Sequence, residues 1–255
     1  MYVMFHDYSL YIVMFFIAMI SGAINVVSGG GGFLSISALL LLGLPPSNAL
    51  ATNKVQSFGS CVTSGLCFLR KGGIDLETGK FIFFSVFVGA AVGTVLIQFI
   101  DVGFLRKLIP IIMIAIAIYF ILTPTVNNKN VNRRVSLCLF CFIISLVGFY
   151  DGFLGAGAGT FYTIAYISLW GVHIDKAQMN ANFLNLSSNI ASVLFFIFGG
   201  KIIWPLGIVM LIGQIFGGYF GAKLVITKGK KIIKPMIIFV SIIISLNLIY
   251  ESCKG

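Results

Sequence analysis

Two glycine-rich segments interrupt apolar stretches of the chain, and their backbone chemistry suits the binding of a small anion. Where the chain returns to helix after such a break, as we expect at Phe33, free N–H groups and the positive end of the helix dipole point back into the gap. Backbone that is unwound in apolar surroundings is stable only where protein buries it or water wets it, so we expect the breaks to line a wet cavity. Alternatively, the glycines only let helices pack closely. They are Gly29, Gly30, Gly31 and Gly32 in the first segment and Gly155, Gly157 and Gly159 in the second.

A stripe of neutral polar side chains follows each glycine segment at helical spacing. In the first half, Asn53, Gln56, Ser57 and Ser60 recur at i, i+3, i+4 and i+7, and in the second Asn182, Asn185 and Asn189 recur in the same way. Their donors can replace the hydration shell of a small oxyanion, or they form interhelical hydrogen bonds worth about 0.6 kcal/mol each. The candidate binding residues on these stripes are Thr52, Asn53, Gln56, Ser57, Asn180, Asn182 and Asn185.

Two ionisable residues adjoin these features. Lys54 lies beside Asn53, one turn into an apolar stretch, where an ammonium group either extends to the membrane surface or contacts an anion. Asp151 precedes the second glycine segment, where its carboxyl group either carries a coupling proton or caps and orients the loop. The sequence leaves both pairs of alternatives open.

No group of residues in the sequence predicts catalysis. His6 and His173 have no second histidine or acid at the spacing of metal ligands, and no nucleophile–base pair or phosphate loop occurs. Cys138 and Cys141 form a Cys-x-x-Cys pair inside an apolar run, and we interpret them as packing residues. We therefore expect no enzyme activity, no cofactor and no metal site.

The composition indicates a lipid environment. Hydrophobic residues make up 59% of the 255 residues and charged residues 9%, with a mean hydropathy of +1.07. A soluble protein carries about 25% charged residues. This excludes a soluble enzyme, a nucleic-acid-binding protein and a secreted disulfide scaffold, although the net charge is +10. The basic residues are better explained as determinants of membrane orientation.

The apolar stretches predict an all-α, polytopic membrane protein of about ten membrane segments. A helix needs about 20 apolar residues to cross about 30 Å of hydrocarbon. Eight stretches are long enough, at about 8–27, 50–69, 80–100, 104–122, 135–150, 178–198, 203–225 and 232–250. Two shorter stretches, at about 33–44 and 160–171, follow the glycine segments as half-helices that either cross or turn back. With ten passages most Lys and Arg residues lie on one side, which makes that side cytoplasmic and puts both termini outside.

The second half of the chain repeats the first with an offset of 128 residues. This offset superposes Gly29 on Gly157, Phe33 on Phe161 and Gly43 on Gly171. Five segments per half is an odd number, so the second half must enter the membrane inverted, as in many secondary transporters. We expect a first repeat bundle at residues 1–124, a polar linker at 125–134 and a second repeat bundle at 135–255.

The first half resembles the TauE/SafE sulfite exporter family, also called TSUP. The resemblance is carried by the four glycines and Phe33, the corner GLPP at 43–46, the string ATNK at 51–54 and the string RKG at 70–72. The duplicated second half extends it over nearly the whole chain. It implies an integral transporter of the bacterial inner membrane that moves small anions, often sulfite or organosulfonates. The second half departs from a plain copy, since Ala158 and Thr160 stand where the first half has Gly30 and Gly32.

The sequence thus favours a transporter that exports sulfite, an organosulfonate or a related sulfur oxyanion. The alternatives are a channel without coupled transport, and an accessory membrane subunit or intramembrane enzyme. Uptake of a metal cation is disfavoured because Asp151 is the one acidic residue near a glycine segment. The expected partners are a small inorganic or organosulfur anion and the lipid bilayer, with no nucleic acid and with assembly into a homo-oligomer left open.

Overall fold

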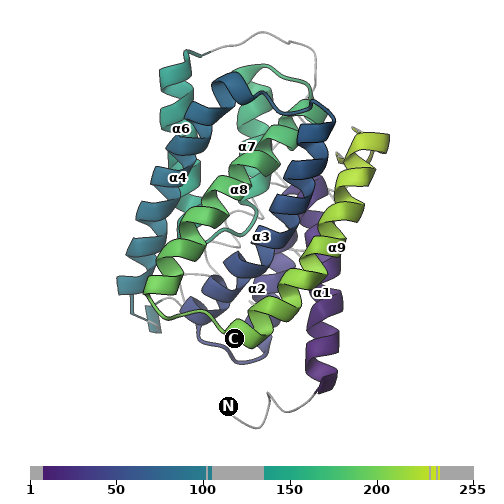
Figure 1. Cartoon of the computed structure of the whole chain (residues 1–255). Coiled ribbons are helices and arrows are strands. Elements are labelled where there is room, and N and C mark those ends of the chain that lie inside the picture. The colour runs from purple at the N-terminus through teal and green to yellow at the C-terminus, as the bar shows by residue number, and fades with distance from the viewer. Residues whose placement is uncertain (1–7, 102, 105–134, 230, 234, 236–255) are drawn as a thin grey trace, which may run out of the picture.

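The computed structural model describes residues 8–101, 103–104, 135–229, 231–233 and 235, and it places helices and no strand among them (Figure 1). The expected all-α class is therefore found. The elements are α1 (Tyr8–Ser28), α2 (Gly31–Leu41), α3 (Pro46–Arg70), α4 (Leu76–Phe99), α6 (Leu137–Phe153), α7 (Ala158–Ala165), the π-helix η2 (Tyr166–Trp170), α8 (Ile174–Phe198) and α9 (Trp204–Lys228).

The membrane-facing character of the helices follows from their length and apolar surface. Among the described helices, α1, α4, α8 and α9 are long and apolar enough to cross a membrane. Helices α3 and α8 are both 25 residues long, but the polar stripe of α3 lowers its mean hydropathy below that of α8. Phe84 and Phe142 are 67% and 63% exposed on the outside, as expected of side chains that contact lipid. These features support a membrane location.

Part of the expected span count falls where the structure gives no description. The linker at 125–134 lies outside the described residues, as do nearly all of the expected spans at 104–122 and 232–250. The six other expected long spans each correspond to a described helix. The two short stretches correspond to α2 and to α7 with η2.

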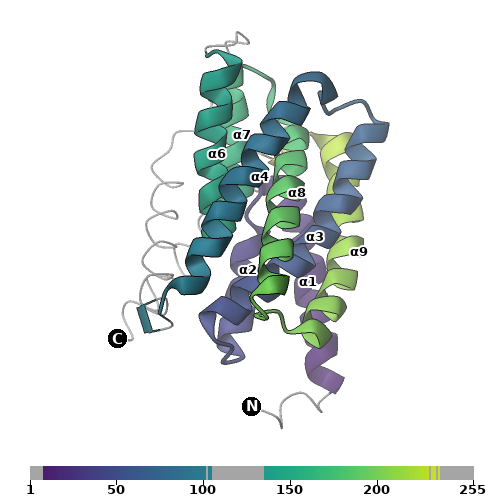
Figure 2. The ribbon, with the colours of Figure 1, turned by 60° about the vertical axis from the view of Figure 1, so that its left-hand side comes forward.

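Helices α3 and α8 form the polar centre of the described bundle, and paired helices flank them (Figure 2). Most of the buried polar side chains belong to α3 and α8. On one side α1 packs against α9, and on the other α4 packs against α6. Glycines allow both contacts, because a Cβ added at Gly217 of α9 would lie 2.0 Å from the Met19 carbonyl oxygen, and one at Gly93 of α4 would lie 2.1 Å from that of Phe149.

The first glycine break is shorter than expected. Helix α2 begins at Gly31 with Gly30 as its N-cap, so the chain returns to helix two residues before Phe33. Glycine disfavours a helix by about 1 kcal/mol per residue. Packing overrides this preference, since a Cβ added at Gly31 would lie 2.0 Å from the Ser21 carbonyl oxygen of α1. Gly31 and Gly32 therefore permit close helix packing, and only Gly29 and Gly30 remain outside a helix.

Local backbone geometry recurs at a constant spacing along the chain. Gly29 and Gly157 have φ values of 77° and 76°, Gly43 and Gly171 of 76° and 74°, and Gly72 and Gly200 of 68° and 62°. The members of each pair are 128 residues apart, and so are the first residues of α3 and α8, since 174 − 46 = 128. In Figure 1, α3 ascends and α8 descends, so the two corresponding helices run in opposite directions.

Candidate functional site

A buried ion pair joins α3 to α6 in the interior of the bundle. Lys54 Nζ lies 2.6 Å from Asp151 Oδ1, and the two side chains are 3% and 2% exposed. It is the one salt bridge found among the described residues. Charges are expensive in a membrane interior, so a pair at this depth marks a functional site by default.

The surroundings of the pair provide each charge with a further polar neighbour. The Tyr162 hydroxyl of α7 donates a hydrogen bond to Asp151 Oδ2 over 3.1 Å. Lys54 Nζ donates to Ser188 Oγ of α8 over 3.4 Å. The second glycine segment passes next to the ammonium, because a Cβ added at Gly155 would lie 3.0 Å from Lys54 Nζ. Glycine at position 155, with φ of 80°, is what allows the backbone to approach so closely.

Lys54 therefore does not take the first of the two roles expected from the sequence, extension to the membrane surface. Its ammonium group does not extend to the membrane surface, because it is buried, and its anionic contact is the carboxylate of Asp151. Asp151 is likewise more than a loop cap, since its two oxygens accept from Lys54 and Tyr162. The physical reason is mutual neutralisation, because each charge alone would be strongly disfavoured at this depth.

The two glycine segments pack against each other at the place where the sequence predicted a wet cavity. A Cβ added at Gly29 would lie 2.2 Å from Thr160 N, and one at Gly159 would lie 2.5 Å from Gly29 Cα. Thr160 Oγ1 also donates to the Ser28 carbonyl oxygen over 2.6 Å. Backbone from one half thus seals the break in the other. The unwound segments are therefore stabilised by burial in protein and not by contact with water.

Several of the expected binding residues meet around this contact. A Cβ added at Gly32 would lie 3.6 Å from the Gly155 carbonyl oxygen and 3.9 Å from Asn53 Nδ2, and one at Gly159 would lie 3.4 Å from Asn185 Nδ2. The site therefore brings together the first turn of α2, the second glycine segment and the polar stripes of α3 and α8. Buried with them are Gly30, Gly157, Gln56 and Ser57.

Gln56 is an incompletely bonded member of the stripe. Its Nε2 donates to Asn53 Oδ1 over 3.0 Å, while its buried Oε1 has no hydrogen-bond partner. Asn185 accepts from Asn189 Nδ2 over 2.8 Å, and Asn189 also contacts Cys61 Sγ at 3.3 Å. An unpaired buried amide oxygen is unfavourable by about 1–3 kcal/mol. Gln56 Oε1 therefore contributes nothing to the stability of the fold through hydrogen bonding.

Three expected binding residues lie elsewhere and have structural partners. Thr52 Oγ1 accepts from the Ile203 backbone N–H at the start of α9. Asn182 Nδ2 donates to the Val26 carbonyl oxygen at the end of α1. Asn180 bonds the loop before α4, donating to the Gly73 carbonyl oxygen over 3.2 Å. Their side chains bond backbone groups at helix ends and in a loop. This is the interhelical hydrogen bonding that the sequence analysis gave as the alternative to anion binding.

Two residues beside the ion pair were not among the candidate binding residues of the sequence analysis. Tyr162 and Ser188 contact the ion pair directly. Ser188 belongs to the second polar stripe, but nothing in its spacing distinguishes it from its neighbours. Tyr162 lies 11 residues after Asp151 in a glycine-rich segment, where only the tertiary path of the chain brings the two together.

A pocket of about 230 Å³ opens at the end of the bundle where α3 ends and α8 begins. Its walls include Asp75, Tyr166, Trp170 and Lys176. The hydroxyl of Thr78 donates to Asp75 and lowers the pKa of this carboxyl, so Asp75 is ionised at neutral pH. Along α8, Asn180 in the pocket wall lies about 12 Å from Ser188, which contacts Lys54 Nζ.

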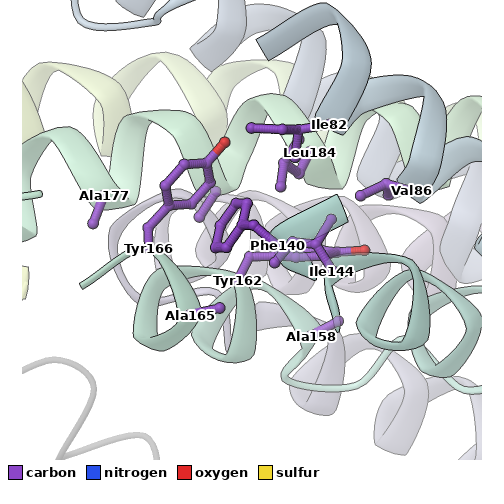
Figure 3. Close-up of a cluster of buried hydrophobic side chains, with 11 residues drawn as sticks. Ile82, Val86, Phe140, Ile144, Ala158, Tyr162, Ala165, Tyr166, Ala177 and Leu184 are labelled. Carbon is purple, nitrogen blue, oxygen red and sulfur yellow. The ribbon is translucent and has the colours of Figure 1, made fainter. Parts of the chain in front are cut away.

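A hydrophobic cluster separates this pocket from the ion pair (Figure 3). Tyr166 belongs both to the pocket wall and to the cluster, and Tyr162 belongs both to the cluster and to the ion-pair site. Figure 3 shows the ring of Phe140 beside them and the two tyrosine hydroxyls pointing in different directions. The pair is thus closed to the pocket by packed side chains. No group of three His, Cys, Asp or Glu residues suited to a metal ion occurs in the described part of the chain.

Apolar helices surround the buried ion pair and the polar side chains near it. This arrangement is that of a helical integral membrane protein. The family model described as sulfite exporter TauE/SafE matches residues 14–248. The chain belongs to the TauE/SafE sulfite exporter family, a family of membrane transporters.

Named relatives agree with this membership. The probable membrane transporter protein YfcA of Escherichia coli K12 is 43% identical over 241 residues, which cover 94% of this chain and 90% of the relative. A probable membrane transporter protein of Haemophilus influenzae is 40% identical over 240 residues and 94% of both chains. The probable membrane transporter protein YdhB of Bacillus subtilis is 23% identical over 245 residues, covering 94% and 98%. No solved structure matches the chain significantly.

Proposed function

We propose that this membrane transporter moves small anions, with sulfite or a related sulfur oxyanion as the substrate and export as the direction. The observation that carries the proposal is the ammonium group of Lys54, buried where the two glycine segments meet. A fixed positive charge beside the first turn of α2 and the amides of Asn53 and Asn185 offers an anion both charge and hydrogen-bond donors. Asp151 is the group at which transport is coupled to a proton.

The architecture we propose is two inverted repeats, residues 1–124 and 135–255, joined by the linker at 125–134. It is supported by the left-handed glycines that recur every 128 residues and by the opposite directions of α3 and α8. The helix pairs also correspond. A shift of 128 residues places α1 on α6 and α4 on α9, so the contact between α1 and α9 is equivalent to the contact between α6 and α4. With the spans expected at 104–122 and 232–250 included, the total is about ten membrane segments.

The sealed contact between the glycine segments corresponds, in this proposal, to a closed stage of transport. Lys54 is reached from either side only when one half moves relative to the other. Two inverted repeats can move relative to each other in two equivalent ways, and each movement opens the site toward one side of the membrane. A channel without coupled transport would need a continuous path past Lys54, and the buried ion pair favours the transporter.

The test is sulfite flux from proteoliposomes that contain the purified protein. We compare wild type with the double variant Lys54→Gln/Asp151→Asn, which removes both charges, keeps the size of both side chains and leaves no buried charge unpaired. Wild type should release sulfite, and the double variant should release it at least tenfold more slowly at equal thermal stability. Equal rates would exclude Lys54 as the anion contact. No flux of any sulfur oxyanion or sulfonate through wild type would exclude the proposed substrates.

A further inference from the structure

The ion pair leaves no positive charge available to a substrate. Lys54 Nζ contacts Asp151 Oδ1 at 2.6 Å and Ser188 Oγ at 3.4 Å, and the Gly155 backbone lies beside it. Both charged side chains are at least 97% buried. An anion can therefore contact the ammonium group only if the Asp151 carboxylate gives up its place.

An anion that displaced the carboxylate without any other change would leave the site with excess negative charge. Lys54 would face two anions, and Asp151 would be buried without its cation. Such a carboxylate takes up a proton rather than stay charged in an apolar interior. The 128-residue offset gives no second ion pair, because Asn182 in the second half is equivalent to Lys54 and Ala23 in the first half is equivalent to Asp151.

The other titratable groups near Asp151 do not supply the missing charge. Those that face it are Lys54 and Cys61 on α3, Tyr162 on α7, and Tyr150 beside it on α6. Helices α4 and α8 also pack against α6, and their charged residues lie within the first five positions of each helix. These residues are Glu77, Lys80, Asp175 and Lys176.

We infer that substrate anion and proton bind together, because the anion replaces the Asp151 carboxylate at Lys54 while that carboxylate is protonated. This inference rests on the proposed function. Before binding the site holds an ammonium and a carboxylate, and after binding it holds an ammonium, the substrate anion and a neutral carboxylic acid. The proton comes from water on whichever side the site has opened to. For a singly charged anion the net charge of the site is zero in both states.

Tyr162 is the positioning residue for this exchange. Its hydroxyl donates to Asp151 Oδ2 at 3.1 Å in the present state. A phenol hydroxyl is both a donor and an acceptor, so it can also accept from the protonated acid. Asp151 therefore keeps one hydrogen-bond partner when it loses Lys54, which lowers the barrier to the exchange.

The consequence is that transport of a singly charged anion is electroneutral. Flux through wild type should follow the combined gradients of anion and proton and should not respond to membrane potential, so export runs down an outward gradient of the anion. Removing the carboxyl group should separate the anion from its proton. In Asp151→Asn the anion moves alone, so its accumulation ratio should change about tenfold for every ~60 mV of imposed potential.

The experiment measures flux of methanesulfonate, which stays singly charged over the working pH range, and of sulfite in proteoliposomes. Potassium gradients with valinomycin set the potential, and a trapped dye reports internal pH. The matched control is Asp175→Asn, which removes a carboxylate of α8 outside the site. Wild type and Asp175→Asn should move one proton with each methanesulfonate, independent of potential. Asp151→Asn should move none and should follow the potential.

A potential-dependent methanesulfonate flux through wild type, without proton movement, would overturn the inference and leave the proposed function intact. Absence of flux for both anions would instead contradict the proposed function. If Asp151→Asn does not fold, the wild-type measurement still decides between the two outcomes. Tyr162→Phe adds a second readout, since slower flux with an unchanged one-to-one proton ratio is expected of a positioning residue.

Discussion

Lys54 and Asp151 are 97 positions apart in the chain and meet between two helices that belong to different halves. Such a pair is a poor source of stability, because desolvation of both charges offsets most of their attraction. A pair of apolar side chains would hold α3 and α6 together at least as well. A function that requires two opposite charges in the interior of the bundle explains the pair better than stability does.

The stability of the pair can be tested with single and double neutral variants. Lys54→Gln leaves the Asp151 carboxylate buried without its cation and should lower the free energy of unfolding by about 3–5 kcal/mol. Adding Asp151→Asn should recover most of that loss, because no charge is then left unpaired. Thermal unfolding in one detergent at one pH gives the comparison. Lys71→Gln, at an exposed position, is the control and should change the stability by less than about 0.5 kcal/mol. Losses that add in the double variant would contradict the pairing.

At the residue scale the sequence identified the participants better than their contacts. Lys54 and Asp151 both stood out, because charges in apolar stretches are rare. Their pairing has no local signal, since it depends on how α3 and α6 cross. Asn182 matched the expected stripe in type and spacing and Asn180 in type, yet they bond the end of α1 and the loop before α4. Periodicity shows which side chains face inward, while the choice among inward partners is made by tertiary packing.

The short helices α2 and α7–η2 each lie between two left-handed glycines. Gly29 and Gly43 bound α2, and Gly157 and Gly171 bound α7–η2. A residue with a Cβ is strained at such φ values, which explains why glycine stands at all four places. The sequence predicted both segments, but it placed the start of the first one too late. Close packing of Gly31 on α1, which no local pattern reports, moved that boundary. The π-helical turn of η2 was likewise not predictable from periodicity.

The contact between the two glycine segments can be separated from backbone strain by two matched substitutions. Gly29 and Gly43 have φ values of 77° and 76°, but a Cβ at Gly43 would meet nothing within 4 Å. Gly43→Ala should therefore lose about 1–2 kcal/mol of stability from strain alone. Gly29→Ala adds a collision with Thr160 N and should lose about 1–3 kcal/mol more. Thermal unfolding in detergent measures both, and equal losses would show that the segments do not pack tightly in the protein.

For the whole molecule, composition was sufficient to predict a helical membrane protein, because 59% hydrophobic residues cannot all be hidden in a soluble domain of this size. The constant spacing of 128 residues was also visible in the sequence. The closed contact was not, because a transporter sequence encodes several conformations and nothing in it says which is lowest in free energy. The sequence predicted a wet cavity at the glycine segments, whereas the structure packs the two segments against each other at Gly29, Gly159 and Thr160.

The positions of the basic residues predict how the molecule is oriented in the membrane. Arg70 and Lys71 end α3, Lys80 and Lys176 lie in the first two turns of α4 and α8, and Lys228 ends α9. Figure 1 shows all these helix ends at the upper end of the bundle. The positive-inside rule predicts that this end is cytoplasmic and that the loop from α2 to α3 at the lower end faces outside.

Two exposed positions at opposite ends of the bundle test this orientation. Leu41 is 84% exposed at the end of α2, and Lys71 is exposed just after α3. In a background without the native cysteines, Leu41→Cys should react with a membrane-impermeant thiol reagent added to intact cells. Lys71→Cys should react only after the cells are permeabilised, because the bilayer shields it. The reverse pattern would invert the molecule. Because the side chain is exposed at both sites, burial does not explain a difference in labelling. The cytoplasmic face that the comparison assigns is the side from which an exporter must take its anion.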